Sequence, residues 1–133
     1  MAVLLVDAAN VVGARPDGWW RDRAGATQRL LRRLADADLT TPDGSRITEV
    51  VAVVEGRARD VAAPEGVRVV RAEGSGDDAL VACATELSDA GTPLVVVTAD
   101  RGLRARLPVG TAVLGPGRLL AALDAAGNRS RPT

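Results

Sequence analysis

Short apolar runs recur along the chain and alternate with segments of helical spacing. The first run, at 3–6, is continuously apolar, as in a strand that is buried on both faces of a sheet. Four later runs of the same kind predict strands at 50–54, 67–70, 94–97 and 111–114. Between the strands, apolar spacing and turn residues predict helices at 17–36, 74–88, 100–107 and 118–126.

Strands that alternate with helices predict an α/β fold. The expected architecture is a three-layer α/β/α domain around a central, mainly parallel sheet of five strands. The sequence shows no internal repeat and no linker, so we expect one domain at 1–127. The residues at 128–133 have the composition of a flexible C-terminal tail.

Length and composition agree with one folded domain. The chain has 133 residues, of which 47% are hydrophobic and 26% charged, so it can bury a core. Its longest apolar run is far shorter than the roughly 20 residues that cross a bilayer, so no membrane partner is expected. The first seven residues lack the basic segment of a signal peptide, and the single cysteine, Cys83, suits a reducing compartment. Both features predict a cytoplasmic protein.

The absence of histidine narrows the chemistry. A chain with no histidine and one cysteine has no Ser-His-Asp triad and no zinc site of the usual ligands. Its 17 basic residues, all arginine, balance 17 acidic ones, so no global basic field indicates a nucleic-acid partner. The arginines nevertheless gather at 15–33 and 101–106, and arginine suits phosphate contacts.

Acidic residues stand where predicted strands end or the next helix begins: Asp7, Glu55, Asp77, Asp78 and Asp100. The carboxyl ends of parallel strands meet at one edge of a sheet, so these side chains are expected to converge there. Carboxylates that converge repel one another unless a cation neutralises them. Because the chain has neither lysine nor histidine, Mg²⁺ or Mn²⁺ is the expected counter-charge.

Each of these residues also has a simpler interpretation. Asp77 and Asp100 are suitable helix N-caps, and Glu55 taken alone is typical of an exposed loop. Asn10, on the loop expected after the first strand, could orient a metal-bound water or a phosphate oxygen, or it could close a turn. Asp7 is harder to interpret as an exposed surface residue, because it directly follows an apolar strand, and a buried carboxylate needs a partner or a metal ion.

Three motifs follow one another along the chain: Val-Asp-Ala-Ala-Asn-Val-Val-Gly at 6–13, Gly-Asp-Asp-Ala-Leu at 76–80 and the segment 95–103. In this order they resemble the NYN family, a branch of the PIN-like nucleases, and in particular its bacterial YacP-like members. The resemblance implies a PIN-like sheet with strand order 3-2-1-4-5 and a metal-dependent ribonuclease that hydrolyses RNA phosphodiester bonds. It assigns Asp7, Asp78 and Asp100 as metal ligands, with Asp77 as the competing match and Glu55 at a position where relatives often have Asp.

The sequence departs from the family pattern in two places. Ala8 stands where relatives usually have glycine, and no second acid follows Asp100 within a few residues. The second departure leaves open whether one metal ion or two are held.

An RNA substrate needs positive and stacking partners near the carboxylates. Arg15, Arg101 and Arg104 are placed for phosphate contacts. Trp20, one of only two aromatic residues, is the candidate for stacking on a base, although a tryptophan at a helix start is often packed. The sequence leaves open a homodimer, or a ribosomal or RNA-processing partner.

Other functions can be compared with the same sequence features. A non-catalytic RNA-binding or assembly module on the PIN-like fold is the main alternative. A phosphatase of the haloacid dehalogenase type would need an acid at Ala9 and a lysine, and the loop at 8–13 lacks the GxGxxG spacing of a dinucleotide site. A toxin of a toxin–antitoxin pair would share the PIN-like fold.

Overall fold

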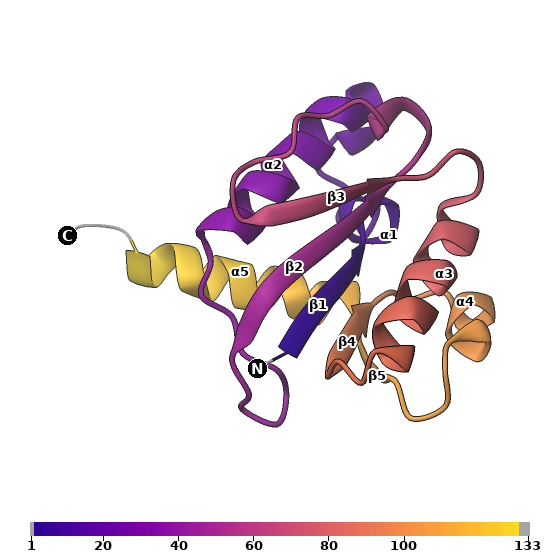
Figure 1. Ribbon diagram of the computed structural model, residues 1–133. Helices are drawn as coiled ribbons and strands as arrows, with labels where there is room; N and C mark the ends of the chain where they lie inside the picture. Colours follow the sequence, from indigo (N-terminus) through magenta and orange to yellow (C-terminus); the bar gives the residue numbers. More distant parts are fainter. Residues whose placement is uncertain (1, 131–133) are drawn as a thin grey trace.

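Strands and helices alternate along the whole described chain (Figure 1). The computed structural model describes residues 2–130. The elements are β1 (Ala2–Asp7), α1 (Ala8–Val12), η1 (Trp19–Arg21), α2 (Arg23–Asp36), β2 (Ile47–Val54), η2 (Gly56–Ala58), β3 (Val67–Arg71), α3 (Gly76–Asp89), β4 (Leu94–Val97), α4 (Arg101–Arg106), β5 (Ala112–Leu114) and α5 (Pro116–Ser130).

The five strands form one sheet in the order β3-β2-β1-β4-β5, and every neighbouring pair is parallel. β1 is central, with Val6 paired to Ala52 of β2 and to Val97 of β4. The predicted α/β fold and strand order are confirmed. The carboxyl ends of β1 and β4 consequently lie side by side, and so do those of β1 and β2.

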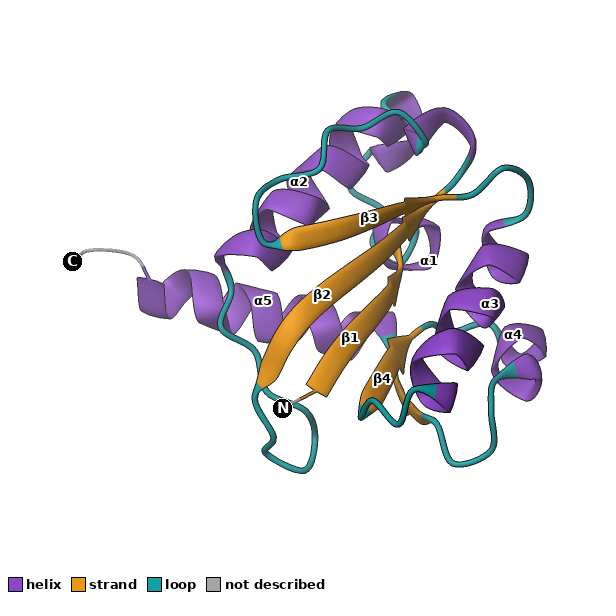
Figure 2. Ribbon diagram, in the orientation of Figure 1, coloured by secondary structure: helices purple, strands orange, loops and turns teal. Residues whose placement is uncertain are grey.

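Helices cover both faces of the sheet, as the continuously apolar first strand requires (Figure 2). Leu4 and Val6 face a core that also contains buried residues of α1, α2 and α5. Val3 and Leu5 face the opposite core, against α3 and α4. Because side chains alternate along a strand, Asp7 belongs to the α3 and α4 side.

The helix α2 has a local start signal and an apolar face. The side chain of Asp22 accepts a hydrogen bond from the backbone N of Gly25 over 2.9 Å, which satisfies one free N–H of the first turn. Leu30, Leu31 and Leu34 are buried against the sheet. Truncation of a leucine buried in this way to alanine typically lowers the free energy of unfolding by about 2–5 kcal/mol.

Three boundaries differ from the sequence prediction. The segment after β1 is a helix, α1, so Asn10 lies on a helix and not on a loop. The helix expected to begin near residue 17 begins at Arg23. Gly18, with a φ of 90°, precedes the short 3-10 helix η1, and Asp22, with a φ of −153° and a ψ of 80°, separates η1 from α2. The last helix continues to Ser130, so it includes 128–130 of the expected tail, while 131–133 lie outside the described residues.

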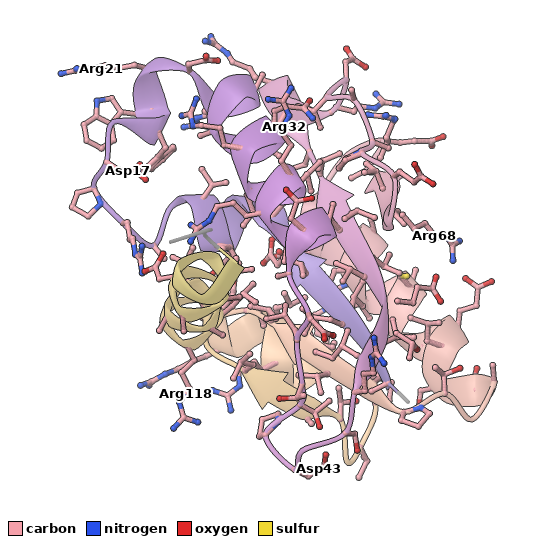
Figure 3. The ribbon with its side chains drawn as sticks, turned by 90° about the vertical axis from the view of Figure 1, so that its left-hand side faces the viewer. Asp17, Arg21, Arg32, Asp43, Arg68 and Arg118 are labelled. Atoms are coloured by element: carbon pink, nitrogen blue, oxygen red, sulfur yellow. The ribbon has the colours of Figure 1, made fainter. Side chains whose placement is uncertain are left out.

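Several charged side chains lie on the outside of the domain. Arg21, Arg68 and Arg118 extend away from the ribbon (Figure 3). None of the helices among residues 2–130 combines the length and the apolar character that crossing a membrane requires.

Candidate functional site

Asp7, the last residue of β1, is the buried acidic residue of the site. Its side chain is only 6% exposed, at the carboxyl end of the central strand. Its Oδ2 atom accepts a hydrogen bond from the Oγ1 of Thr98 over 3.2 Å. Thr98 follows β4, the parallel neighbour of β1, so the sheet register itself places the two residues together.

Burial governs the ionisation of Asp7. Removal from water raises the pKa of its carboxyl group from 3.8 to about 6, since a charge is disfavoured in a poorly hydrated place. Contacts with the Thr98 hydroxyl and the Asn10 backbone oppose this rise, whereas the negative charges of Asp77 and Glu55 add to it. At neutral pH, the carboxyl group of Asp7 is therefore ionised, and its negative charge is only weakly stabilised by its surroundings.

Asp100 lies beyond Thr98 and begins the next helix. The backbone N of Asp100 donates to the Thr98 hydroxyl oxygen over 3.2 Å, and its own Oδ1 accepts from the backbone N of Leu103 over 3.1 Å. Asp100 is thus the N-cap of α4, as one of the two interpretations predicted. Its side chain is half-buried, and its charge raises the pKa of Asp77.

Asn10 ties α1 to the loop that carries Asp100. Its Oδ1 accepts a hydrogen bond from the backbone N of Ala99 over 3.0 Å. This contact spans 89 positions of sequence and joins the segment after β1 to the segment after β4. Asn10 consequently holds the residue that directly precedes Asp100.

Glu55 reaches the start of α3. Its Oε2 accepts from the backbone N of Gly76 over 2.7 Å, at the helix end where a negative charge is favoured. A Cβ at position 76 would lie 2.7–2.8 Å from the Glu55 carboxylate, so the approach depends on glycine. Gly76 is not among the site residues predicted from the sequence. The Gly-Ser-Gly run before Asp77 could have indicated it, because glycine allows another group to approach the backbone closely.

The two adjacent acids of α3 face different surroundings. Asp77 is half-buried, and its pKa is raised first by burial and then by the charges of Asp100 and Glu55. Asp78 is 71% exposed and forms an ion pair with Arg106 of α4, with 2.7 Å between Oδ1 and the guanidinium nitrogen. The charges of Asp100 and Glu55 thus act on Asp77, whereas Asp78 is exposed and paired with Arg106.

We call Asp7, Glu55, Asp77 and Asp100 the carboxylate cluster. Asp7 and Asp77 each interact electrostatically with other members, and no member forms an ion pair with any residue of the described chain. Acids that act on one another in this way, with no ion-pair partner among the described residues, are suited to a hard divalent cation.

Within residues 2–130, no three acidic, histidine or cysteine side chains lie close enough to enclose one metal ion. Mg²⁺ does not need such an enclosure, because it typically keeps several waters and uses one or two carboxylates together with substrate phosphates. The donor atoms of the cluster are carboxylate oxygens, which is the ligand type that Mg²⁺ and Mn²⁺ prefer.

The residues predicted to contact RNA differ in their exposure and in their partners. Arg101 and Arg104 are exposed on α4, directly after Asp100. Arg15 instead forms an ion pair with Asp124 of α5 over 2.8 Å, and Asp124 also pairs with Arg33 over 2.5 Å. Trp20 is 53% exposed, and its ring lies edge-on to the ring of Trp19, with 5.9 Å between centroids.

Comparison with solved structures shows a YacP-like fold. The crystal structure of Rae1 (YacP) from Bacillus subtilis is similar with a TM-score of 0.73 and 20% sequence identity, over 97% of this chain and 77% of that chain. A mutant of the same protein gives a TM-score of 0.69 and 22% identity, over 97% and 79% of the two chains. No protein-family model and no curated protein matches the sequence. At these identities the likeness concerns the fold.

Proposed function

We propose that this chain is a metal-dependent ribonuclease that hydrolyses RNA phosphodiester bonds at the carboxylate cluster. The observation that carries the proposal is the buried, poorly compensated carboxylate of Asp7, with further acids around it at the carboxyl edge of a parallel sheet. The YacP-like fold and the three NYN-like motifs support it. The family resemblance supports an endoribonuclease that would act on single-stranded or structured RNA rather than on duplex DNA.

One or two of the carboxylates of Asp7, Asp77 and Asp100 would hold the Mg²⁺ or Mn²⁺ ion together with substrate phosphate oxygens, with Glu55 beside them. The bound cation would polarise the phosphodiester and offset the negative charge on the leaving oxygen. We assign this role to Asp77 and not Asp78, since the carboxylate of Asp78 is engaged by Arg106.

The remaining side chains orient the acids and the substrate. Thr98 fixes the Asp7 carboxylate, and Asn10 anchors the loop that precedes Asp100. Glu55, which accepts a hydrogen bond from the backbone N of Gly76, would orient the attacking water and accept its proton. Arg101 and Arg104 would contact phosphates from the exposed side of α4.

A cleavage assay tests the proposal. End-labelled RNA is incubated with the wild-type chain and Mg²⁺ or Mn²⁺, with EDTA, and with the Asp7→Asn and Asp100→Asn variants. We expect cleavage by the wild type that EDTA and both substitutions abolish. Asp36→Asn, an exposed change at the end of α2, is the matched control and should cleave normally. Cleavage that survives both cluster substitutions would contradict the proposed site.

One observation favours the second candidate, a non-catalytic RNA-binding or assembly module on the same fold. Among the described residues, no three acidic side chains are arranged so that they could hold one metal ion. This candidate predicts RNA binding without cleavage at any concentration of Mg²⁺ or Mn²⁺, so the same assay with a parallel binding measurement separates the two functions.

A further inference from the structure

A small pocket shares one residue, Glu55, with the carboxylate cluster. Ala8 and Ala9, which also line the pocket, follow Asp7 in the chain. The opposite wall comes from Trp19 of η1 and Arg23 of α2. A group bound in this pocket would therefore contact one member of the carboxylate cluster, Glu55.

The pocket has the size of one ring system. Its volume is about 110 Å³, well below the roughly 300–1,000 Å³ of pockets that enclose whole small molecules. Val12, Val54 and Ala58 supply apolar surface, and Trp19 supplies an aromatic ring. A flat, partly apolar ring fits these walls better than a sugar or a bare ion does.

The charges around the pocket favour an anionic chain. Arg23 and Arg57 both line it, and neither forms an ion pair within the described part of the chain. The one acidic lining residue, Glu55, is already hydrogen-bonded to the backbone of Gly76. Two guanidinium groups with no ion-pair partner among the described residues, beside an aromatic ring, are suited to a base with its adjoining phosphates.

The Trp19 ring is held in place before any ligand arrives. The guanidinium carbon of Arg23 lies 5.1 Å from the ring centroid, and the ring of Trp20 meets that of Trp19 at 83°. A ring with little rotamer freedom to lose makes a better stacking surface than a mobile one.

We infer that this pocket binds one unstacked nucleobase of the RNA next to the bond that is cut, with Trp19 and Arg23 contacting the base and Arg57 an adjoining phosphate. The inference rests on the proposed function, because the pocket shares Glu55 with the carboxylate cluster. It assigns the aromatic contact to Trp19, whereas the sequence pointed to Trp20. It also predicts a preference for RNA whose bases are free of pairing at this position.

The experiment uses the protein's own fluorescence. The chain has two tryptophans and no tyrosine or phenylalanine, so its aromatic emission comes from Trp19 and Trp20 alone. The Trp20→Leu variant isolates Trp19, and the Trp19→Leu variant isolates Trp20. Each is titrated in EDTA, where cleavage is suppressed, with a short labelled oligoribonucleotide and with an abasic oligomer of equal length. Tryptophan quenching and anisotropy of the label are followed together.

We expect the base-containing oligomer to quench Trp19 emission and the abasic oligomer to bind about tenfold more weakly without quenching. Arg23→Gln and Arg57→Gln should weaken binding of the base-containing oligomer several-fold. Their matched controls, Arg32→Gln on α2 and Arg59→Gln beside η2, should bind as the wild type does, with circular dichroism confirming the fold of each variant.

Two results would overturn the inference. One is equal binding and equal quenching by the base-containing and abasic oligomers; the other is binding without any change in Trp19 emission. Because binding is measured without a divalent ion, the outcome is independent of catalysis. Base-dependent quenching with no cleavage in Mg²⁺ or Mn²⁺ would support the pocket and reject the nuclease, and the reverse pattern would reject the pocket alone.

Discussion

Thr98 donates a hydrogen bond from its Oγ1 to the Oδ2 of Asp7 over 3.2 Å, and both side chains are buried. The same hydroxyl oxygen accepts from the backbone N of Asp100. One threonine therefore joins the end of the central strand to the start of the α4 segment. This link holds two members of the carboxylate cluster in a fixed relation.

The first prediction concerns this hydroxyl. Thr98→Val keeps the shape of the side chain but removes the donor to a buried carboxylate, so the free energy of unfolding should fall by about 1–3 kcal/mol. Thr98→Ser keeps the hydroxyl and should be nearer the wild type. Urea unfolding of the three proteins measures the difference, and equal losses for valine and serine would show that the hydroxyl contributes nothing.

The second prediction follows from the raised pKa of Asp7. A carboxyl with a pKa of about 6 in the folded state and 3.8 otherwise holds its proton more tightly when folded. Its ionisation therefore destabilises the fold as the pH rises from about 4 to about 6, and the penalty is fully present above that range. Asp7→Asn should raise the free energy of unfolding at pH 7.5 by up to about 2–3 kcal/mol.

The sign of this effect is checked by repeating the unfolding experiment near pH 4. There the wild-type carboxyl is protonated in the folded state, so the advantage of Asp7→Asn should disappear. Two results would contradict the burial of an ionised Asp7. One is an Asp7→Asn variant that is less stable than the wild type at pH 7.5; the other is the same gain in unfolding free energy at both pH values.

The third prediction tests the contact between Glu55 and Gly76. Gly76→Ala places a Cβ within 2.8 Å of the Glu55 carboxylate and should displace it, with a loss of about 1 kcal/mol in unfolding free energy. Gly74→Ala is the matched control, since a Cβ there meets nothing within 4 Å. In a double-mutant cycle with Glu55→Ala, most of the loss at position 76 should vanish. Additive effects would mean that the two residues are not coupled.

The fourth prediction concerns metal addition and removal. A cation that binds only the folded state at ten times its dissociation constant stabilises it by about 1.4 kcal/mol, which raises the unfolding temperature by roughly 3–6 °C. Mg²⁺ or Mn²⁺ should produce such a rise, and EDTA should reverse it. In Asp7→Asn the rise should be small, and an unchanged rise in that variant would place the metal elsewhere.

Much of the fold follows from local sequence patterns. The continuously apolar β1 and the apolar stripe of α2 are visible without any structure, and alternation of strands and helices leaves few ways to arrange a parallel sheet. The helix α1 was not predicted, because five residues are too few to show a helical period. Ala8 and Val11 stabilise it through burial, which is a tertiary effect.

The acidic residues of the site could be proposed from their positions after strands, but their partners could not. Asp77 and Asp78 are equivalent in sequence, and the packing of α3 against the sheet decides which of them faces the other acids. The contacts of Glu55 with Gly76 and of Asn10 with Ala99 join segments 21 and 89 positions apart. Trp19 likewise gains its pocket from chain segments that meet only in the fold.

The adjacent acids of α3 give the most direct measurement of the central claim. RNA cleavage is followed at saturating Mn²⁺ for the wild type, Asp77→Asn and Asp78→Asn, three proteins that differ by one charge at neighbouring positions. We predict that the wild type cleaves, that Asp77→Asn loses at least a hundredfold in rate, and that Asp78→Asn, which loses only an exposed ion pair with Arg106, stays within a fewfold of the wild type. No metal-dependent cleavage by the wild type, or loss of cleavage in Asp78→Asn with retention in Asp77→Asn, would contradict the account.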